Sequence, residues 1–187
     1  IDPERHLAAI MFTSGSTGPE KGVMVTHRNL ACNTRDIIGY LGLTAADRAM
    51  VVLPAQCDPQ TKAAAELLVR YVEESSGATL NVVAEGSPAP DQPPPIRIHV
   101  GPSDYVSEHV ALPEDLDDDG LVICAVDDRN LAIVGPTPWG TEFGVCEFLE
   151  RYVGVRWLMP GADGDDVPKH ATIEVARAKV IEQPAFF

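Results

Sequence analysis

Residues able to contact phosphate gather near the amino-terminal end of the sequence, in the segment TSGSTGPEKG over residues 13–22. Small residues in such a loop leave backbone N–H groups and hydroxyls free to face phosphate oxygens, and Lys21 adds a positive charge. The segment differs from the G-x-x-x-x-G-K-[ST] loop, because no glycine directly precedes Lys21 and no serine or threonine follows it. The pattern predicts a phosphate-binding loop made by Thr13, Ser14, Gly15, Ser16, Thr17, Gly18 and Lys21.

A strand, the loop and a helix are the elements expected to position these residues. The apolar run over 7–12 predicts a buried strand, and residues 23–25 predict a second short one. Thr26 is expected to cap a helix that continues to about Leu41. Another strand is predicted over residues 49–54.

The loop and the residues after it, up to Leu30, resemble the phosphate-loop signature of the adenylate-forming (AMP-binding) superfamily. This superfamily includes acyl-CoA synthetases, luciferases and peptide-synthetase adenylation domains. The resemblance fades by Pro54 and covers about a quarter of the chain. It implies that the seven loop residues would contact the phosphates of ATP, with magnesium. Glu20 is a departure, since the family usually has proline there.

The later motifs of that superfamily, for adenine, ribose, magnesium and a catalytic lysine, are not found in this sequence. The stretch Trp139–Glu142 superficially resembles its aromatic-Gly-x-Thr-Glu element, but one intervening residue is missing and an amphipathic helix starts here. Helix initiation is the favoured interpretation. We therefore expect no complete catalytic site, no activity of the chain alone and no bound cofactor.

Beyond residue 50, predicted strands alternate with two strong helices. Asp58 followed by Pro59 is typical of a helix start and Gly77 of its end, and residues 137–154 carry similar signals. Strands are expected near residues 51, 80, 96, 121, 131, 155 and 172, with a hairpin turn at 127–130. The prediction is an α/β fold: one mixed sheet packed with two main amphipathic helices, plus the amino-terminal strand–loop–helix segment.

Residues 51–175 carry a second resemblance, most distinctive in NLAIVG at 130–135, GVCEFLE at 144–150 and GVRWLMPG at 154–161. These stretches are similar, in the same order, to the α/β domain before the catalytic barrel in α-glucuronidase-like and hexosaminidase-like glycoside hydrolases. The resemblance implies an accessory, non-catalytic domain whose partner is a downstream catalytic barrel or a polysaccharide-associated domain. Trp139 stands where that family often has arginine.

Acidic side chains in this region form no recognisable active or metal site. Glu147 and Glu150 are three residues apart on a predicted helix, whereas glycosidase carboxylates must flank a sugar bond, so we interpret the pair as a solvent face. The acidic cluster at 115–119 lacks the alternating ligands, turn glycine and closing glutamate of an EF-hand loop. No metal site and no catalytic residue is predicted.

The remaining reactive side chains have plain structural interpretations. His99 and His170 are isolated in the sequence, and Trp157 lies in apolar surroundings that favour a core role. The four cysteines form neither a C-x-x-C pair nor a zinc spacing, and Cys124 and Cys146 are expected to be buried thiols.

Charge separates the chain into two parts. The first 50 residues balance acidic against basic side chains, so the net charge of −14 belongs to residues 51–187. Such a surface repels nucleic acid and anionic lipid, and neither is an expected partner. The apolar runs are too short for a membrane span, and the opening Ile1-Asp2-Pro3 predicts a trimmed or excised fragment, so localisation stays open.

These observations predict two segments, an adenylate-forming-enzyme-like fragment over residues 1–50 and a glycoside-hydrolase-associated α/β domain over 51–187. The leading hypothesis is an accessory domain of a carbohydrate-active enzyme. The alternatives are a fragment of an ATP-dependent adenylate-forming ligase that retains only the phosphate loop, and a fusion or artificial chain without evolved activity.

Overall fold

The computed structural model describes residues 7–13, 21–26, 41–44, 49–88, 96–175, 177 and 179–184. Two compact units divide the chain, Ile1–Gly39 and Tyr40–Phe187. In the first unit, β1 (Leu7–Thr13) and β2 (Lys21–Thr26) pair antiparallel, which confirms both predicted strands. The helix predicted after Thr26 falls on residues outside those described, except at its expected end near Leu41, which is the first residue of strand β3 (Leu41–Thr44), so that end was wrong.

A six-stranded mixed sheet with the order β12-β7-β8-β6-β4-β5 forms the centre of the second unit, so the predicted α/β class is confirmed. Its strands are β4 (Ala49–Leu53), β5 (Asn81–Ala84), β6 (Ile96–Val100), β7 (Leu121–Ala125), β8 (Asn130–Val134) and β12 (Lys179–Glu182). Strands β5, β4, β6 and β8 are parallel, whereas β7 runs antiparallel to both β8 and β12. The edge strand β5 leaves Val82 42% exposed.

Two predicted strands lie outside this sheet, so their assignment to it was wrong. Strand β9 (Arg156–Trp157) pairs with β10 (Asp165–Asp166), and β11 (Thr172–Val175) pairs with β3 (Leu41–Thr44). The reason is that β12 takes the sheet edge beside β7, while β3 offers β11 a separate antiparallel partner.

Both predicted main helices are present with their predicted ends. Helix α2 (Pro59–Ser76) begins where the Asp58 carboxylate accepts the Gln60 N–H at 2.7 Å, and it ends at Gly77 with φ 74°. Helix α4 (Pro138–Phe148) is capped by Thr137 and continues as a π-helical turn over Leu149–Val153, which the sequence pattern did not predict.

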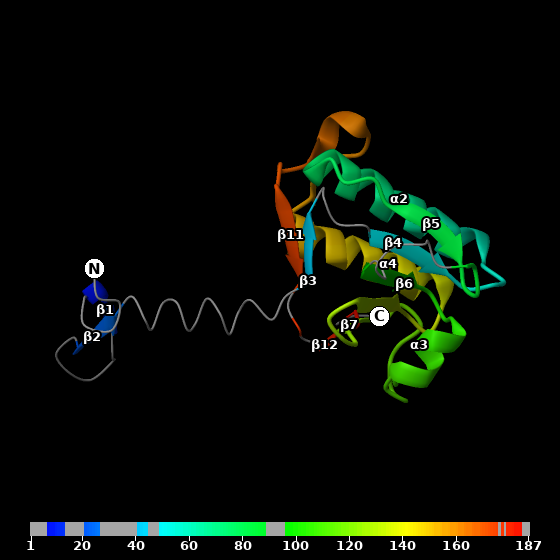
Figure 1. Cartoon of the computed structure of the whole chain (residues 1–187), viewed down its shortest axis with the longest axis horizontal. Helices are drawn as coiled ribbons and strands as arrows, with labels where there is room; N and C mark the ends of the chain where they lie inside the picture. The colour runs from blue at the N-terminus through cyan, green and yellow to red at the C-terminus, as the bar shows by residue number, and fades with distance from the viewer. Residues whose placement is uncertain are drawn as a thin grey trace. The chain divides into compact units, whose positions relative to one another are not determined.

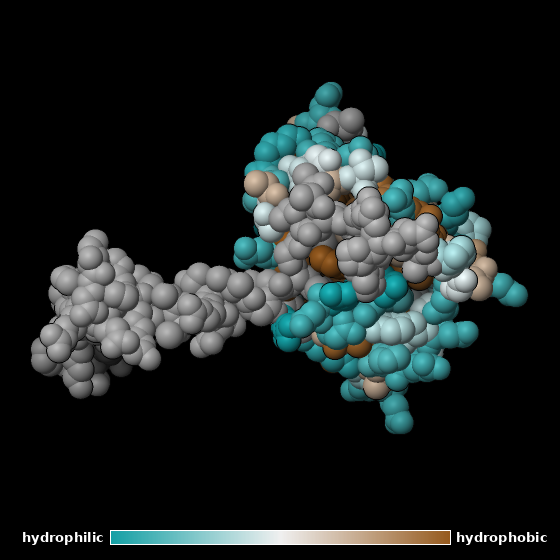
Figure 2. Space-filling view, viewed as in Figure 1, coloured by the Kyte–Doolittle hydropathy of each residue, from teal (hydrophilic) through white to brown (hydrophobic). Residues whose placement is uncertain are grey.

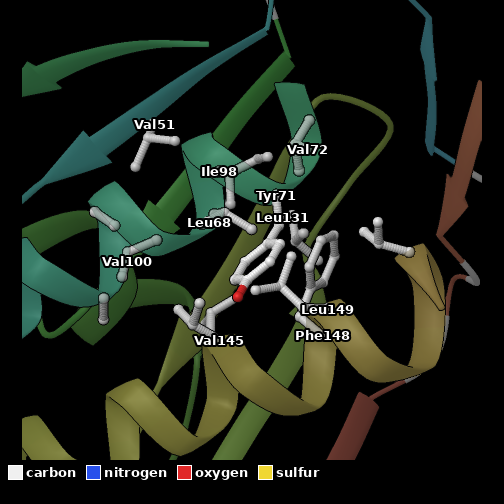
Figure 3. Close-up of a cluster of buried hydrophobic side chains, with 14 of the residues drawn as sticks. Val51, Leu68, Tyr71, Val72, Ile98, Val100, Leu131, Val145, Phe148 and Leu149 are labelled. Carbon is white, nitrogen blue, oxygen red and sulfur yellow. The ribbon is translucent and has the colours of Figure 1, made fainter. Parts of the chain in front are cut away.

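Helices α2 and α4 cover one face of the sheet and bury the main core against it (Figure 1). In the close-up of Figure 3, side chains from both helices meet residues of the strands in one cluster. Its fully buried members include Val51, Leu68, Tyr71, Val72, Ile98, Val100, Leu131, Val145, Phe148 and Leu149. Burying each of the large aliphatic or aromatic side chains contributes about 1.5–3 kcal/mol.

The second face of the sheet is covered only in part. The short helix α3 (Asp104–His109), which was not predicted, packs through Val106 on a small apolar cluster that includes Val122 and Val134. This cluster lies on β7 and β8. The described residues place no helix over the same face of β4 and β5, and a pocket lies there.

Candidate functional site

The predicted phosphate loop is bracketed by the two strands of the first unit. Thr13 is the last residue of β1, Lys21 is the first residue of β2, and the two are paired in the strand register. Ser14, Gly15, Ser16, Thr17 and Gly18 lie outside the described residues. The hairpin therefore brings the two ends of the loop together, and its role in phosphate binding stays a prediction.

In the second unit, the partly covered sheet face holds a cavity of about 270 Å³. The cavity has apolar walls from Met50, Val52 and Val83 and polar side chains at one side. Its lining residues are Met50, Val52, Val83, Ala84, Glu85, Gly86, Ser87, Pro88, Arg97, His99, Tyr105 and Asn130. An apolar cavity with a few convergent polar groups is the usual form of a small-molecule site.

His99 is the most constrained polar residue of this cavity. It is only 4% exposed, and its Nε2 lies 3.2 Å from Asn130 Oδ1. The Asn130 amide nitrogen donates to both oxygens of Asp127, at 3.0 and 2.8 Å, so the amide oxygen faces the histidine. We therefore assign the donating hydrogen to Nε2 of His99, which leaves Nδ1 as an acceptor.

Nδ1 of His99 is buried and has no hydrogen-bond partner among the described residues. An unsatisfied buried polar atom costs about 1–3 kcal/mol of stability. Burial lowers the pKa of His99, although the hydrogen bond to Asn130 opposes the change, so the neutral ring is favoured. A neutral ring with a free acceptor can receive an O–H or N–H from a ligand.

The ring of His99 is part of an aromatic stack. Its ring lies 4.2 Å from that of Tyr105, and Tyr105 in turn stacks on His109 at the same separation. The interpretation of His99 as isolated was therefore wrong. The alternation of β6 puts His99 on the same face as Arg97, but its partner Asn130 on β8 is distant in sequence. Its other partner, Tyr105, is close in sequence but lies on α3, a helix that was not predicted.

Glu85 also lines the cavity, but its carboxylate is hydrogen-bonded to the backbone of α3. Its carboxylate accepts the N–H groups of Asp104 and Tyr105, both at 2.9 Å. Burial acts to raise the pKa of Glu85, but these two hydrogen bonds outweigh it and the pKa is lowered. Arg97 differs, because no described residue forms an ion pair with its guanidinium.

A second cavity, larger and more open at about 630 Å³, lies beside Trp157. The Trp157 indole N–H donates to the Tyr71 hydroxyl at 2.9 Å, and the two rings meet edge to face. Leu158 and Met159, at the rim, are 73% and 59% exposed. Trp157 is half-buried against the core, which agrees with the core role expected for it.

The carboxylates singled out from the sequence have structural roles. Glu147 binds Arg151 on the next turn of the helix, and Arg151 also binds Glu182 of β12, whereas Glu150 is exposed. Among the described residues, no group of three or more histidine, cysteine, aspartate and glutamate side chains could hold a metal ion. Figure 2 shows mainly hydrophilic residues over the described surface on this side.

Other predicted features are placed as follows. The segment Trp139–Glu142 forms the first turns of α4, which agrees with helix initiation. Cys124 and Cys146 are only half-buried, and burial raises the pKa of the Cys146 thiol to about 11. None of the described helices is long and apolar enough to cross a membrane.

Comparison with known proteins finds both resemblances. Residues 1–93 match the family model described as AMP-binding enzyme. The chain is 44% identical over 55 residues to the probable acyl-activating enzyme 16, chloroplastic, of Arabidopsis thaliana, covering 29% of this chain and 8% of that protein. It is 53% identical over 34 residues to the long-chain-fatty-acid–CoA ligase of Bacillus subtilis, covering 18% and 6%. The chain thus spans less than a tenth of these curated relatives.

Part of one solved glycoside hydrolase has a similar fold. A GH115 4-O-methyl-α-glucuronidase, BtGH115A, with specificity for decorated arabinogalactans, superposes with a TM-score of 0.56 at 18% identity. The match covers 78% of this chain and 18% of that one. A β-hexosaminidase of Streptomyces plicatus gives a TM-score of 0.48 at 16% identity, over 79% and 24% of the two chains. The likeness to BtGH115A shows the fold.

The two resemblances overlap in sequence. The AMP-binding match continues to residue 93, past β4 and β5, which belong to the six-stranded sheet, and past α2, which packs on it. The second structural unit begins at Tyr40, ahead of the boundary assigned at residue 50. The assignment of the two segments to separate families remains a prediction.

Proposed function

We propose that residues 40–187 are a non-catalytic accessory α/β domain of a carbohydrate-active enzyme. The observation that carries this proposal is the likeness to BtGH115A, in which most of this chain corresponds to a minor part of the glycoside hydrolase. The partner would be a catalytic barrel or a polysaccharide-associated domain on the same polypeptide. Fold likeness alone is a weak basis for function, so the site geometry has to agree with it.

The placement of Glu147 and Glu150 supports a non-catalytic role. Glycosidase carboxylates flank the scissile bond, about 5–9.5 Å apart. Here both residues are on one helical segment, and Glu147 is bound to Arg151, so the two carboxylates do not oppose each other across a cleft. Through Arg151, Glu147 is linked instead to Glu182 of β12, whereas Glu150 is exposed.

The experiment that tests this proposal combines activity with gene context. Purified protein is expected to release no nitrophenol from aryl α-glucuronides or aryl N-acetyl-β-glucosaminides. Turnover that is lost in Glu147→Gln or Glu150→Gln would overturn the proposal. Sequencing the gene on both sides should reveal a glycoside hydrolase barrel in the same reading frame, and an adenylation domain there would favour the second candidate.

A fragment of an adenylate-forming ligase is the second candidate, favoured by the AMP-binding match over residues 1–93. In that case ATP and magnesium would be the cofactors, and Thr13 and Lys21, opposite each other in the hairpin, would stand at the two ends of the loop around the phosphates. The likeness to BtGH115A covers 78% of this chain, whereas the AMP-binding match covers residues 1–93, so we rank this function second.

A further inference from the structure

We infer that the cavity on the second face of the sheet, lined by Arg97 and His99, binds a small hydroxylated carboxylate. This site is independent of both proposed functions, because it lies within the second unit and uses none of the phosphate-loop residues. Neither resemblance assigns a ligand to it.

The first step concerns the unpaired nitrogen of His99. Nε2 of the ring is engaged with Asn130 at the start of β8. The second ring nitrogen, Nδ1, has no hydrogen-bond partner among the described residues, and the other neighbour of β6 is β4, where Val52 pairs with His99 in the register. Val52, Glu85 and His99 itself all line the cavity. The cavity is thus bordered by a histidine ring that has one acceptor without a donor.

The second step concerns charge. Arg97 precedes His99 by two residues, shares its sheet face and lines the same cavity, and no described residue forms an ion pair with it. A guanidinium group binds carboxylates through two parallel hydrogen bonds. The negative charge of Glu85 is already compensated by two N–H groups of α3, so it competes only weakly for Arg97.

The third step concerns the hydrogen-bond donor that the ligand offers and the size of the ligand. A hydroxyl can donate to Nδ1 of His99, whereas an ammonium group in this cavity would be repelled by Arg97. Met50, Val52 and Val83 provide an apolar wall for the carbon skeleton. The volume of about 270 Å³ is below the roughly 300–1,000 Å³ of pockets for drug-sized ligands, so the ligand is a small molecule.

Calorimetric titration of the full chain with three matched probes tests this inference. D-gluconate offers the carboxylate and hydroxyls, sorbitol only hydroxyls, and hexanoate only the carboxylate. We expect gluconate to bind at least tenfold more tightly than either of the other two. No detectable gluconate binding, or equal binding of gluconate and either control, would overturn the inference.

Variants identify the site even if the buried histidine tolerates substitution poorly. Arg97→Gln should weaken gluconate binding at least tenfold, and Arg129→Gln, in the hairpin outside the cavity, should leave it unchanged. His99→Gln, checked for folding by circular dichroism, should remove the preference for gluconate over hexanoate. Equal affinities of the Arg97→Gln and wild-type proteins, or equal losses in both arginine variants, would refute the site.

Discussion

The hydroxyl of Tyr71 donates a hydrogen bond of 2.6 Å to the carboxylate of Asp165, which lies 94 residues later in the chain. The same hydroxyl accepts the indole N–H of Trp157, so α2 is tied to both strands of the β9–β10 pair. Arg70 adds an ion pair with Asp165 at 3.7 Å and lies over the Tyr71 ring. One buried oxygen thus positions the segment that forms the rim of the larger cavity.

Tyr71→Phe should lower the free energy of unfolding by about 1–3 kcal/mol, because the variant leaves the Trp157 N–H without its acceptor. Urea denaturation followed by tryptophan fluorescence measures the loss. Tyr105→Phe is the control, since no hydrogen bond of its hydroxyl occurs among the described residues, and it should change stability by less than about 0.5 kcal/mol. Equal effects of the two variants would contradict the role of Tyr71.

Gly140→Ala should destabilise the protein by about 1–3 kcal/mol or more, because a Cβ at this position would overlap the backbone oxygen of Gly120. Backbone atoms of a packed turn cannot move aside easily. Gly144→Ala in the same helix is the matched control, since its Cβ would meet the side-chain methyl of Ile133 at 2.9 Å. Its smaller strain is partly offset by the higher helix propensity of alanine. Thermal melting should give Gly140→Ala a lower melting temperature than Gly144→Ala.

Stability should fall as the pH is lowered from about 7.5 to 5.5, in part because of His99. Burial lowers the pKa of His99 in the folded protein, so the unfolded chain binds the proton first as the pH falls below its ordinary value of about 6.5. The contribution of neutral His99 to the free energy of unfolding is therefore complete above about pH 6.5. It is lost as the pH falls toward the lower pKa of His99 in the folded state.

His99→Gln should reduce the slope of the free energy of unfolding against pH, and urea titrations at several pH values measure this slope. The charged groups near the ring are Glu85, Arg97 and Asp127. The pKa values of Glu85 and Asp127 are lowered in the fold, so their stabilisation is lost only below about pH 4, and Arg97 stays charged throughout. An unchanged slope between pH 7.5 and 5.5 would contradict the prediction.

ATP is expected to bind weakly or not at all, and no acyl-adenylate should form with any carboxylic acid. Tight binding needs an adenine slot and a carboxylate-held magnesium in addition to a phosphate loop, and the net charge of −14 opposes an anionic ligand. Calorimetry with Mg-ATP on the wild type and Lys21→Ala measures this. Micromolar affinity that disappears in the variant would reverse the ranking of the two proposed functions.

The sequence predicted best those elements whose signals are local. The cap at Asp58, the stop at Gly77 and the turn at 127–130 depend on neighbouring residues, and the structure has α2 and the β7–β8 hairpin at these places. Strand β12 was missed because Lys179–Glu182 has charged ends and little periodicity. The six residues of α3 are too few for a helical pattern.

Pairing between distant segments could not be predicted in the same way. The strand at Thr172–Val175 was predicted, but its partner β3 follows a stretch whose pattern favoured a helix, so it was assigned to the wrong sheet. The cavity could not be predicted for the same reason. Alternation along β6 places Arg97 and His99 on one face, but only the fold reveals that α3 covers a different part of it.

The two edges of the six-stranded sheet differ in their capacity to recruit another molecule. Strand β12 carries Lys179 and Glu182, and charges on an edge discourage intermolecular pairing. Strand β5 has the uncharged sequence NVVA, and among the described residues no strand pairs with its outer side. Intermolecular strand pairing is therefore more favourable at β5 than at β12, and a lysine in place of Val82 would discourage it.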